Sequence, residues 1–351
     1  MRRRQFLTTV ASATAGFVAG RGSTAAALQA PSAKRQAMVG GRPVRVVDVH
    51  SHWDMPVPAS IVGGTPFAAR ANGQGIEQRI ASMDALGIDS AVISVNDFWW
   101  WDATDRGLAR AICDHHNQTL ATAARQYPGR LYGMASIPLQ FPDVAVEMMQ
   151  AAVRNGARGI AVGGHVAGES LTAPRFDPLW AKAAEMGELV FMHPNGSANL
   201  IKDGALAGRG GLGNIVGNPL ETTVFLSRLI FDGTFDKFPA LQVCGAHGGG
   251  YLPSYLGRTE VACQRTGQSC IIKRKPSEYL RSNMLADTMV FSEEGLRHLV
   301  AEMGVGRVVF GTDTPFNWPV TIDLVVESPS LSNADKEAIL GGTLTRLLRL
   351  G

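Results

Sequence analysis

The sequence has 351 residues, of which 45% are hydrophobic and 18% are charged. This balance is typical of a globular protein with a large core, and it excludes an intrinsically disordered chain. The formal net charge is +3, but four of the 33 basic residues and none of the 30 acidic ones lie within residues 1–30. The remaining chain is close to neutral, so we expect no basic surface that would bind nucleic acid.

Residues 1–30 have the features of an export signal. Three consecutive arginines precede a Phe-Leu pair and a mildly apolar stretch, and Ala25–Ala27 offers a cleavage site of small residues. Paired arginines in this setting resemble a twin-arginine signal, and the alternative is a disordered basic arm. We therefore expect a periplasmic or secreted protein without a membrane anchor, in which residues 31–44 form a linker and residues 45–351 form one catalytic domain.

A buried strand that leads into two histidines is the central feature of the catalytic domain. The β-branched run Arg45–Val49 predicts a strand, and His50 and His52 follow it. Side chains alternate along a strand, so these two imidazoles lie on one face, with Asp48 in the same row. Two imidazoles on one face can share a metal ion, whereas the alternative is two unrelated polar residues on a strand.

Three later apolar runs each bring one ligand-type residue to a loop that contains glycine or proline. These runs end shortly before His193, His247 and Asp313. Predicted strands alternate with predicted helices eight times along the chain, which indicates a (β/α)8 barrel. The sequence therefore predicts an α/β fold of the TIM-barrel type, with a metal site at the C-terminal ends of strands one, five, six and eight.

The expected elements follow from the period of the apolar residues and from capping signals. Gly87 is expected to end the first helix, and Ser332 with Asp335 to form a capping box at the last one. An aromatic cluster, Phe98–Trp101, follows the second strand and either lines a pocket or packs against a neighbouring loop. Strands are expected at residues 45–49, 90–94, 131–137, 159–162, 189–192, 241–244, 287–291 and 308–310, and helices at 76–86, 105–127, 144–153, 176–186, 221–231 and 293–303.

The four residues His50, His52, His193 and Asp313 offer nitrogen and oxygen donors for a divalent ion, with zinc favoured and manganese as the alternative. Such an ion lowers the pKa of a bound water from ~16 towards ~7. We assign His247 to proton transfer rather than to the metal, because the site needs a proton carrier whose pKa is near the working pH.

The fourth strand indicates how many ions the site holds. Barrels with two bridged ions commonly use a carboxylated lysine, and residues 159–165 contain no lysine. A single ion is therefore favoured. His165 at the end of this segment is either a further ligand or, more simply, a hydrogen-bonded structural residue. The helical segments hold three histidines to which we assign no catalytic role: His115, His116 and His298.

The four cysteines show no spacing typical of a zinc site. Cys113 and Cys244 lie in apolar segments and are expected to be buried. Cys263 and Cys270 flank a polar loop. In an oxidising compartment they either form a disulfide or remain as two thiols.

The motifs around the predicted ligands resemble one known family. They are D-x-H-x-H at Asp48–His52, F-M-H-P at His193, A-H-G-G-G at His247 and G-T-D-T-P-F at Asp313. Together they resemble the amidohydrolase superfamily, and specifically the amidohydrolase-related branch that includes aminocarboxymuconate-semialdehyde decarboxylase. The resemblance covers nearly all of the chain after the export signal, and it implies the same barrel fold and a metal-dependent reaction.

The resemblance also implies roles for particular residues. It places the metal ligands at His50, His52, His193 and Asp313 and the proton-transfer histidine at His247. It further implies that two arginines, at positions Arg79 and Arg258, bind substrate carboxylates, since a guanidinium can bind a carboxylate through two hydrogen bonds.

In the resembling decarboxylase one of these arginines reaches across a dimer interface, so Arg258 implies a homodimer. The alternatives are a solvated helix residue for Arg79 and an ordinary surface arginine for Arg258. Asn195 and Asn214 stand where the resembling decarboxylase has tryptophan, so the substrate is expected to differ.

Two enzymatic functions fit this pattern, and both act on a small molecule. The first is a non-oxidative decarboxylase of an unsaturated or aromatic carboxylic acid, in which metal-bound water and His247 deliver the proton. The second is a hydrolase of a lactone, ester or amide, in which Asp313 takes the proton from the attacking water. A binding protein without turnover is disfavoured, because every residue of the predicted site is present.

Overall fold

Short runs of β-branched and other apolar residues form the strands, because each run can be buried on both faces. The computed structural model describes residues 34–71, 75–266 and 271–351. Within these residues the parallel strands of the main fold are β3 (Val47–Trp53), β4 (Ser90–Val95), β5 (Leu131–Gly133), β6 (Ile160–Val162), β9 (Leu189–Met192), β10 (Gln242–Gly245), β11 (Met284–Asp287) and β12 (Val308–Val309).

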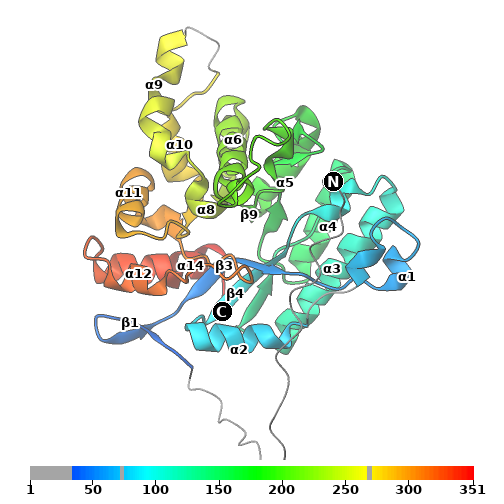
Figure 1. The fold of residues 1–351 in the computed structure, drawn as a ribbon, viewed down its shortest axis with the longest axis horizontal. Helices are drawn as coiled ribbons and strands as arrows, with labels where there is room; N and C mark the ends of the chain where they lie inside the picture. The colour runs from blue at the N-terminus through cyan, green and yellow to red at the C-terminus, as the bar shows by residue number, and fades with distance from the viewer. Residues whose placement is uncertain (1–33, 72–74, 267–270) are drawn as a thin grey trace, which may run out of the picture. The chain divides into compact units, whose positions relative to one another are not determined.

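These strands pair in parallel and close into a barrel. Strands β3, β4 and β5 form one sheet in that order, and β6, β9, β10, β11 and β12 form the other. A parallel bridge between Ala135 and Ile160 joins β5 to β6, and a bridge between Ser51 and Thr314 joins the end of β12 to β3. The predicted (β/α)8 barrel is thereby confirmed, with strands that follow one another around the barrel in chain order (Figure 1).

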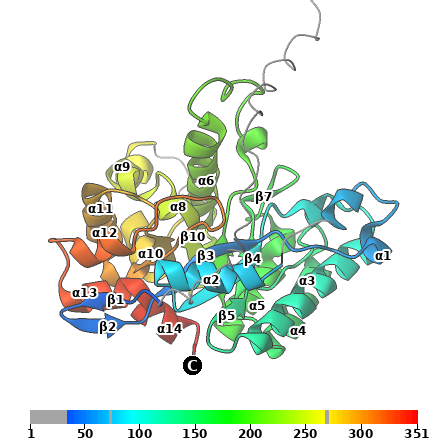
Figure 2. The ribbon, with the colours of Figure 1, turned by 60° about the horizontal axis from the view of Figure 1, so that its bottom comes forward.

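Helices surround the strands (Figures 1 and 2). In the described part of the chain, no helix has the length and apolar character needed to cross a membrane. The longer helices between the strands are α2 (Glu77–Leu86), α3 (Arg106–Gln126), α4 (Pro142–Arg154), α5 (Asp177–Met186), α6 (Asn218–Phe231), α9 (Leu256–Thr266), α10 (Pro276–Ser282) and α11 (Glu293–Met303), and α12 (Ile322–Glu327) follows the last strand. Shorter helices are α1 (Ala59–Val62), α7 (Thr234–Lys237), α8 (Ala246–Gly249), α13 (Asn333–Glu337) and α14 (Thr343–Leu347).

The predicted helix ends are confirmed where a cap was identified. Gly87 follows α2 with φ of 84°, in the left-handed region that favours glycine. Ser332 accepts a hydrogen bond from the backbone N–H of Asp335, whose carboxylate accepts one in return from the N–H of Ser332. Asp105 and Ser292 cap α3 and α11 in the same way, each with a side-chain oxygen that accepts a backbone N–H. Local sequence therefore determines these helix boundaries.

Some expected boundaries were wrong. The third strand, β5, ends at Gly133 rather than at residue 137. The seventh strand is β11 at Met284–Asp287 rather than residues 287–291, so Asp287 lies at its C-terminal end. Part of the expected linker, residues 31–44, forms an antiparallel hairpin of β1 (Ala37–Val39) and β2 (Arg42–Val44), which lies beside α12 and α13 (Figure 2). The hairpin buries Ala37 and Val39, and the proposed export signal lies outside the described residues.

Candidate metal centre

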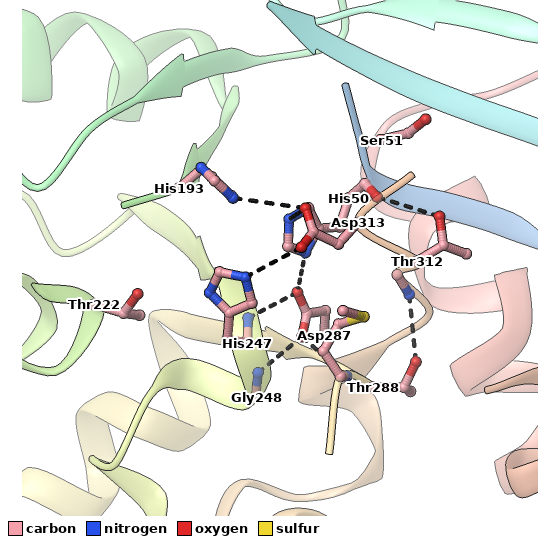
Figure 3. Close-up of polar contacts among 12 residues, drawn as sticks. His50, Ser51, His193, Thr222, His247, Gly248, Asp287, Thr288, Thr312 and Asp313 are labelled. Atoms are coloured by element: carbon pink, nitrogen blue, oxygen red, sulfur yellow. Dashed lines mark hydrogen bonds and ion pairs between the residues drawn. The ribbon is translucent and has the colours of Figure 1, made fainter. Parts of the chain in front are cut away.

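The predicted ligands meet at one end of the barrel, around the carboxylate of Asp313. Oδ1 of Asp313 lies 3.0 Å from Nε2 of His50, 3.1 Å from Nε2 of His52 and 3.8 Å from Nε2 of His193. Oδ2 lies 3.6 Å from Nε2 of His247. Figure 3 shows three of these imidazoles, from different strands or strand ends, pointing toward this carboxylate. The structure thus brings all five residues together.

These side chains fit a divalent ion. Buried nitrogen and oxygen atoms normally have hydrogen-bond partners, yet within the described residues Nε2 of His50, His52 and His193 and Oδ1 of Asp313 have none. Several imidazole nitrogens beside one carboxylate oxygen form a donor set that suits zinc or manganese. One ligand atom each from His50, His193, His247 and Asp313 lies within 4.8 Å of the others, which allows His247 to be either a ligand or the proton carrier.

The charges of the cluster depend strongly on one another. Burial opposes a charge on the His50 imidazole, but Asp313 and Asp287 outweigh this effect and raise its pKa to about 10. Burial lowers the pKa of His52 to about 4. Burial also opposes ionisation of Asp313, but the neighbouring histidines outweigh it and hold its pKa well below the usual range. The cluster therefore favours an ionised Asp313, as metal binding requires, whereas His50 must lose its proton when it binds an ion.

Two polar side chains outside the cluster orient the histidines of β3. Nδ1 of His50 lies 2.6 Å from Oδ2 of Asp287, and Nδ1 of His52 lies 2.9 Å from Oγ of Ser94 on β4. Such contacts leave Nε2 of each ring free to bind a metal ion. Sequence analysis missed both partners, although Asp287 is detectable as a carboxylate at a strand end once β11 is placed correctly.

The backbone at His247 is held in an uncommon conformation. His247 and Gly248 both lie in the left-handed region, with φ of 57° and 66°, which costs energy at a residue with a side chain. The carboxylate of Asp287 accepts the backbone N–H of both residues, at 3.0 Å and 2.8 Å. Asp287 therefore connects His50 and His247, as Figure 3 shows.

Asp48 braces the site through hydrogen bonds rather than joining the metal cluster. Its Oδ1 accepts the backbone N–H of His50 at 3.0 Å and that of Thr312 at 3.1 Å, and its Oδ2 accepts the Thr312 hydroxyl at 2.6 Å. These bonds tie β3 to the loop that carries Asp313. Burial raises the pKa of Asp48 to about 6, although its hydrogen bonds oppose the rise.

The aromatic cluster after β4 packs against a neighbouring loop. Phe98, Trp100 and Trp101 are buried, and the indole N–H groups of both tryptophans donate to the carbonyl oxygen of Ile137, at 2.9 Å and 2.8 Å. A Cβ atom at Gly163, just after β6, would lie 3.1 Å from both the Trp101 ring and Cβ of Asn195. Gly163 therefore lies close to both the aromatic cluster and the loop that follows His193.

The two predicted substrate arginines lie apart from the metal cluster. The guanidinium of Arg79 donates to Oγ of Ser51, at 3.0 Å, and to the carbonyl oxygen of His52. Ser51 points away from the metal cluster in Figure 3, so Arg79 occupies the opposite face of β3, where it does not face the ion. Arg258 is exposed on α9, which extends away from the strands in Figure 1.

The structure also shows the surroundings of His165 and of two cysteines. His165 bonds backbone groups, with Nε2 lying 3.2 Å from the carbonyl oxygen of Gly196, as expected for a structural residue. Cys113 and Cys244 are buried thiols, as predicted. The disulfide considered for Cys263 and Cys270 cannot be placed, because Cys270 lies outside the described residues.

Known proteins are similar to this chain in sequence and in fold. The sequence model of the amidohydrolase family matches residues 47–350. The chain is 30% identical over 288 residues to 2-amino-3-carboxymuconate-6-semialdehyde decarboxylase of Dictyostelium discoideum, across 78% of this chain and 76% of that protein. Its fold resembles the 2,6-dihydroxybenzoate decarboxylase from Rhizobium, with a TM-score of 0.75 at 26% identity, across 88% of this chain and 99% of the other.

A second solved structure adds a bound metal. It is 5-carboxyvanillate decarboxylase from Novosphingobium aromaticivorans, in complex with manganese and 4-hydroxy-3-methoxy-5-nitrobenzoic acid. Its TM-score is 0.77 at 25% identity, and the match covers 90% of this chain and 99% of the other. The matched residues 47–350 contain the barrel strands and all five residues of the metal cluster. This chain therefore belongs to the amidohydrolase family.

Proposed function

We propose that this protein is a metal-dependent, non-oxidative decarboxylase of an aromatic or unsaturated carboxylic acid. The observation that carries the proposal is the buried cluster of four histidines around Asp313, in a chain whose named relatives above are decarboxylases. The lysine-free segment 159–165 supports a site for one ion, and the imidazole-rich donor set suits that ion.

Decarboxylation requires that the bond between a carbon atom and the carboxylate breaks and that a proton takes the place of carbon dioxide. A divalent ion bound by His50, His52, His193 and Asp313 would supply a positive charge that holds the oxygen atoms of the substrate. His247 is placed to hold the proton, since its Nε2 lies 3.6 Å from Asp313 and its side chain remains 13% exposed. Asp287 fixes the backbone from which His247 projects.

The proton would move from Nε2 of His247 to the carbon atom that bears the carboxylate. The electron pair of the broken carbon–carbon bond then remains on that carbon as the new C–H bond, and carbon dioxide leaves. Burial of the cluster excludes water from the reacting atoms, which strengthens the electrostatic interactions that hold the substrate.

The identity of the ion is part of the proposal. Three imidazoles and a carboxylate suit zinc, and the manganese-bound relative supports manganese as the alternative. Metal analysis of the purified protein, followed by reconstitution of the metal-free protein with each ion alone, identifies the ion that restores turnover.

The function is tested with a panel of acids and a labelled solvent. Hydroxybenzoates, 5-carboxyvanillate and a carboxymuconate semialdehyde are incubated with the metal-loaded protein, and released carbon dioxide is measured. We expect release from at least one acid and none from the His247→Ala variant. Turnover of a lactone, ester or amide with incorporation of solvent oxygen, and no carbon dioxide from any acid, would instead establish the hydrolase.

We further propose that the protein is exported and forms a homodimer. Arg258 and Val261, which is 41% exposed, lie on α9, and Tyr255, which is 61% exposed, directly precedes this helix. Exposed apolar side chains in one segment favour contact with another protein, and a second copy would bring Arg258 toward a neighbouring site.

Export is tested separately. Replacement of the paired arginines in residues 1–30 by lysine should stop export, as measured by fractionation of cells.

A further inference from the structure

His193 is held differently from the two histidines of β3. His50 and His52 each have a hydrogen-bond partner at Nδ1, whereas within the described residues neither ring nitrogen of His193 has one. Its backbone N–H donates to the carbonyl oxygen of Val162 at 3.0 Å, which fixes the chain on one side of the residue. The position of the ring therefore depends on how the chain after His193 is held.

A buried carboxylate holds that chain. Glu221, in the first turn of α6, is 1% exposed. Its Oε1 accepts the backbone N–H of Asn195 at 2.9 Å and that of Gly164 at 2.9 Å. Between His193 and Asn195 lies Pro194, whose ring fixes its own backbone angle φ. One carboxylate oxygen thus ties the loops after β6 and β9 to α6.

His165 provides a second tie to the same segment. Its Nε2 donates to the carbonyl oxygen of Gly196 at 3.2 Å, and its Nδ1 accepts the backbone N–H of Gly168 at 3.2 Å. Glu221 and His165 line the same small cavity. The two side chains therefore hold residues 193–196 from adjacent points.

The surrounding sequence accommodates this carboxylate closely. A Cβ atom at Gly164 would lie 2.5 Å from Oε1 and 2.6 Å from Cγ of Glu221, so only glycine leaves room for the carboxylate. A buried carboxylate without donors is costly. The two backbone N–H groups supply donors to Oε1, whereas Oε2 has no hydrogen-bond partner among the described residues. The contact is specific in shape as well as in charge.

We propose that Glu221 and His165 are positioning residues that fix residues 193–196, so that His193 reaches the metal cluster and Asn195 stays next to Gly163. Glu221 holds the backbone two residues after His193. This contact orients the His193 ring, which has no hydrogen-bond partner of its own among the described residues. The inference rests on the metal-dependent function proposed above, and it concerns an effect on the metal site that ordinary structural residues do not have.

The test measures metal affinity without any substrate. Metal-free protein competes with a coloured chelator for Mn²⁺ or Zn²⁺, in the wild type and in the variants Glu221→Ala, Glu221→Gln and His165→Phe. We expect Glu221→Ala to weaken metal binding by about tenfold or more, the usual effect of losing a residue that orients a ligand. Glu221→Gln should recover most of the affinity, because its amide oxygen can accept the same two N–H groups. His165→Phe should give a smaller loss.

Glu188 provides a control, because it is another buried glutamate, next to the strand β9 that leads to His193. It is 8% exposed and precedes β9, at the end opposite to His193, where it lies 3.7 Å from Arg349. Glu188→Ala should lower the melting temperature and leave the metal affinity unchanged. If Glu221→Ala behaves like Glu188→Ala, the positioning role is wrong and Glu221 serves stability alone.

A second variant keeps the test decisive if Glu221→Ala does not fold. Gly164→Ala retains the carboxylate but displaces it, so it should also weaken metal binding, and unchanged affinity in this variant overturns the inference. A wild-type protein that binds neither ion overturns the proposed function and the inference together. A wild type that binds an ion, with variants that bind it equally well, overturns the inference alone.

Discussion

Asp287 accepts a 2.6 Å hydrogen bond from Nδ1 of His50 while the same carboxylate holds the backbone of the His247 turn. His50, a predicted metal ligand, and His247, the predicted proton carrier, thus share one buried anchor. In Asp287→Asn one of the two acceptor oxygens becomes an NH2 group, which would face N–H donors and lose their hydrogen bonds. We expect metal affinity to fall by about 10- to 100-fold, together with kcat/KM, as measured by chelator competition and carbon dioxide release.

Asp236→Asn is the control for this variant. Asp236 accepts a hydrogen bond from the hydroxyl of Tyr279 at 2.7 Å, on α7 and away from the metal cluster. Its replacement should lower stability without changing metal affinity. Equal metal affinity in Asp287→Asn and the wild type would show that the anchor is dispensable for the ion.

The two tryptophans that share one acceptor predict a non-additive effect. Trp100 and Trp101 both donate to the carbonyl oxygen of Ile137, so either one alone keeps this buried oxygen bonded. Each single Trp→Phe variant should lose little stability through this hydrogen bond. The double variant leaves the Ile137 oxygen without either donor, which costs about 1 to 3 kcal/mol of stability. Urea unfolding of the four proteins measures the coupling. Additive free energies of unfolding would contradict the shared role.

His116 makes stability depend on pH. It is fully buried, its ring nitrogens have no hydrogen-bond partner among the described residues, and burial lowers its pKa from 6.5 to about 3. Between these values the unfolded chain binds a proton that the folded protein does not, so stability is lost as the pH falls below 6.5. At pH 5 the loss from this residue is roughly 2 kcal/mol.

A comparison with His116→Phe isolates this residue, because the other histidines are the same in both proteins. Phenylalanine keeps a ring beside Trp99 and Trp100, which lie 5.7 Å and 5.0 Å from the imidazole centroid. Urea unfolding of the metal-free proteins at pH 7 and pH 5 should show that the free energy of unfolding decreases less with falling pH in the variant than in the wild type. An equal decrease in the free energy of unfolding in both proteins would assign the acid sensitivity to other groups.

The barrel and the cluster followed from sequence because each ligand stands at the end of an apolar run. His193 and Asp313 could be found in this way, since a strand fixes where its last side chain lies. Asp287 could not, because β11 was placed three residues too late. Glu221 lies on a helix and acts through backbone N–H groups of two distant loops, which no local pattern reveals. Arg79 has the expected residue type, but its side chain lies on the other face of β3.

Metal binding should stabilise the folded protein. Nε2 of His50 and Oδ1 of Asp313 lack hydrogen-bond partners within the described residues, and an ion that binds only the folded state satisfies them. At a free ion concentration of about 100 times Kd the gain is about 2.7 kcal/mol, visible as a higher Tm. Asp313→Ala should abolish the response. A Tm that rises equally in Asp313→Ala would place the ion elsewhere.

The proposed homodimer predicts that two inactive variants restore each other. If Arg258 serves the site of the neighbouring copy, a mixed dimer of His247→Ala and Arg258→Ala has one site with both lesions and one site with neither, because a twofold interface exchanges what it shares. Subunits labelled with two different dyes confirm exchange by energy transfer. Carbon dioxide release from the mixture should then reach about one quarter of the wild-type rate, since half of the dimers formed at random are mixed and each has one intact site. Confirmed exchange without recovered activity would show that each barrel does not depend on the arginine of its neighbour.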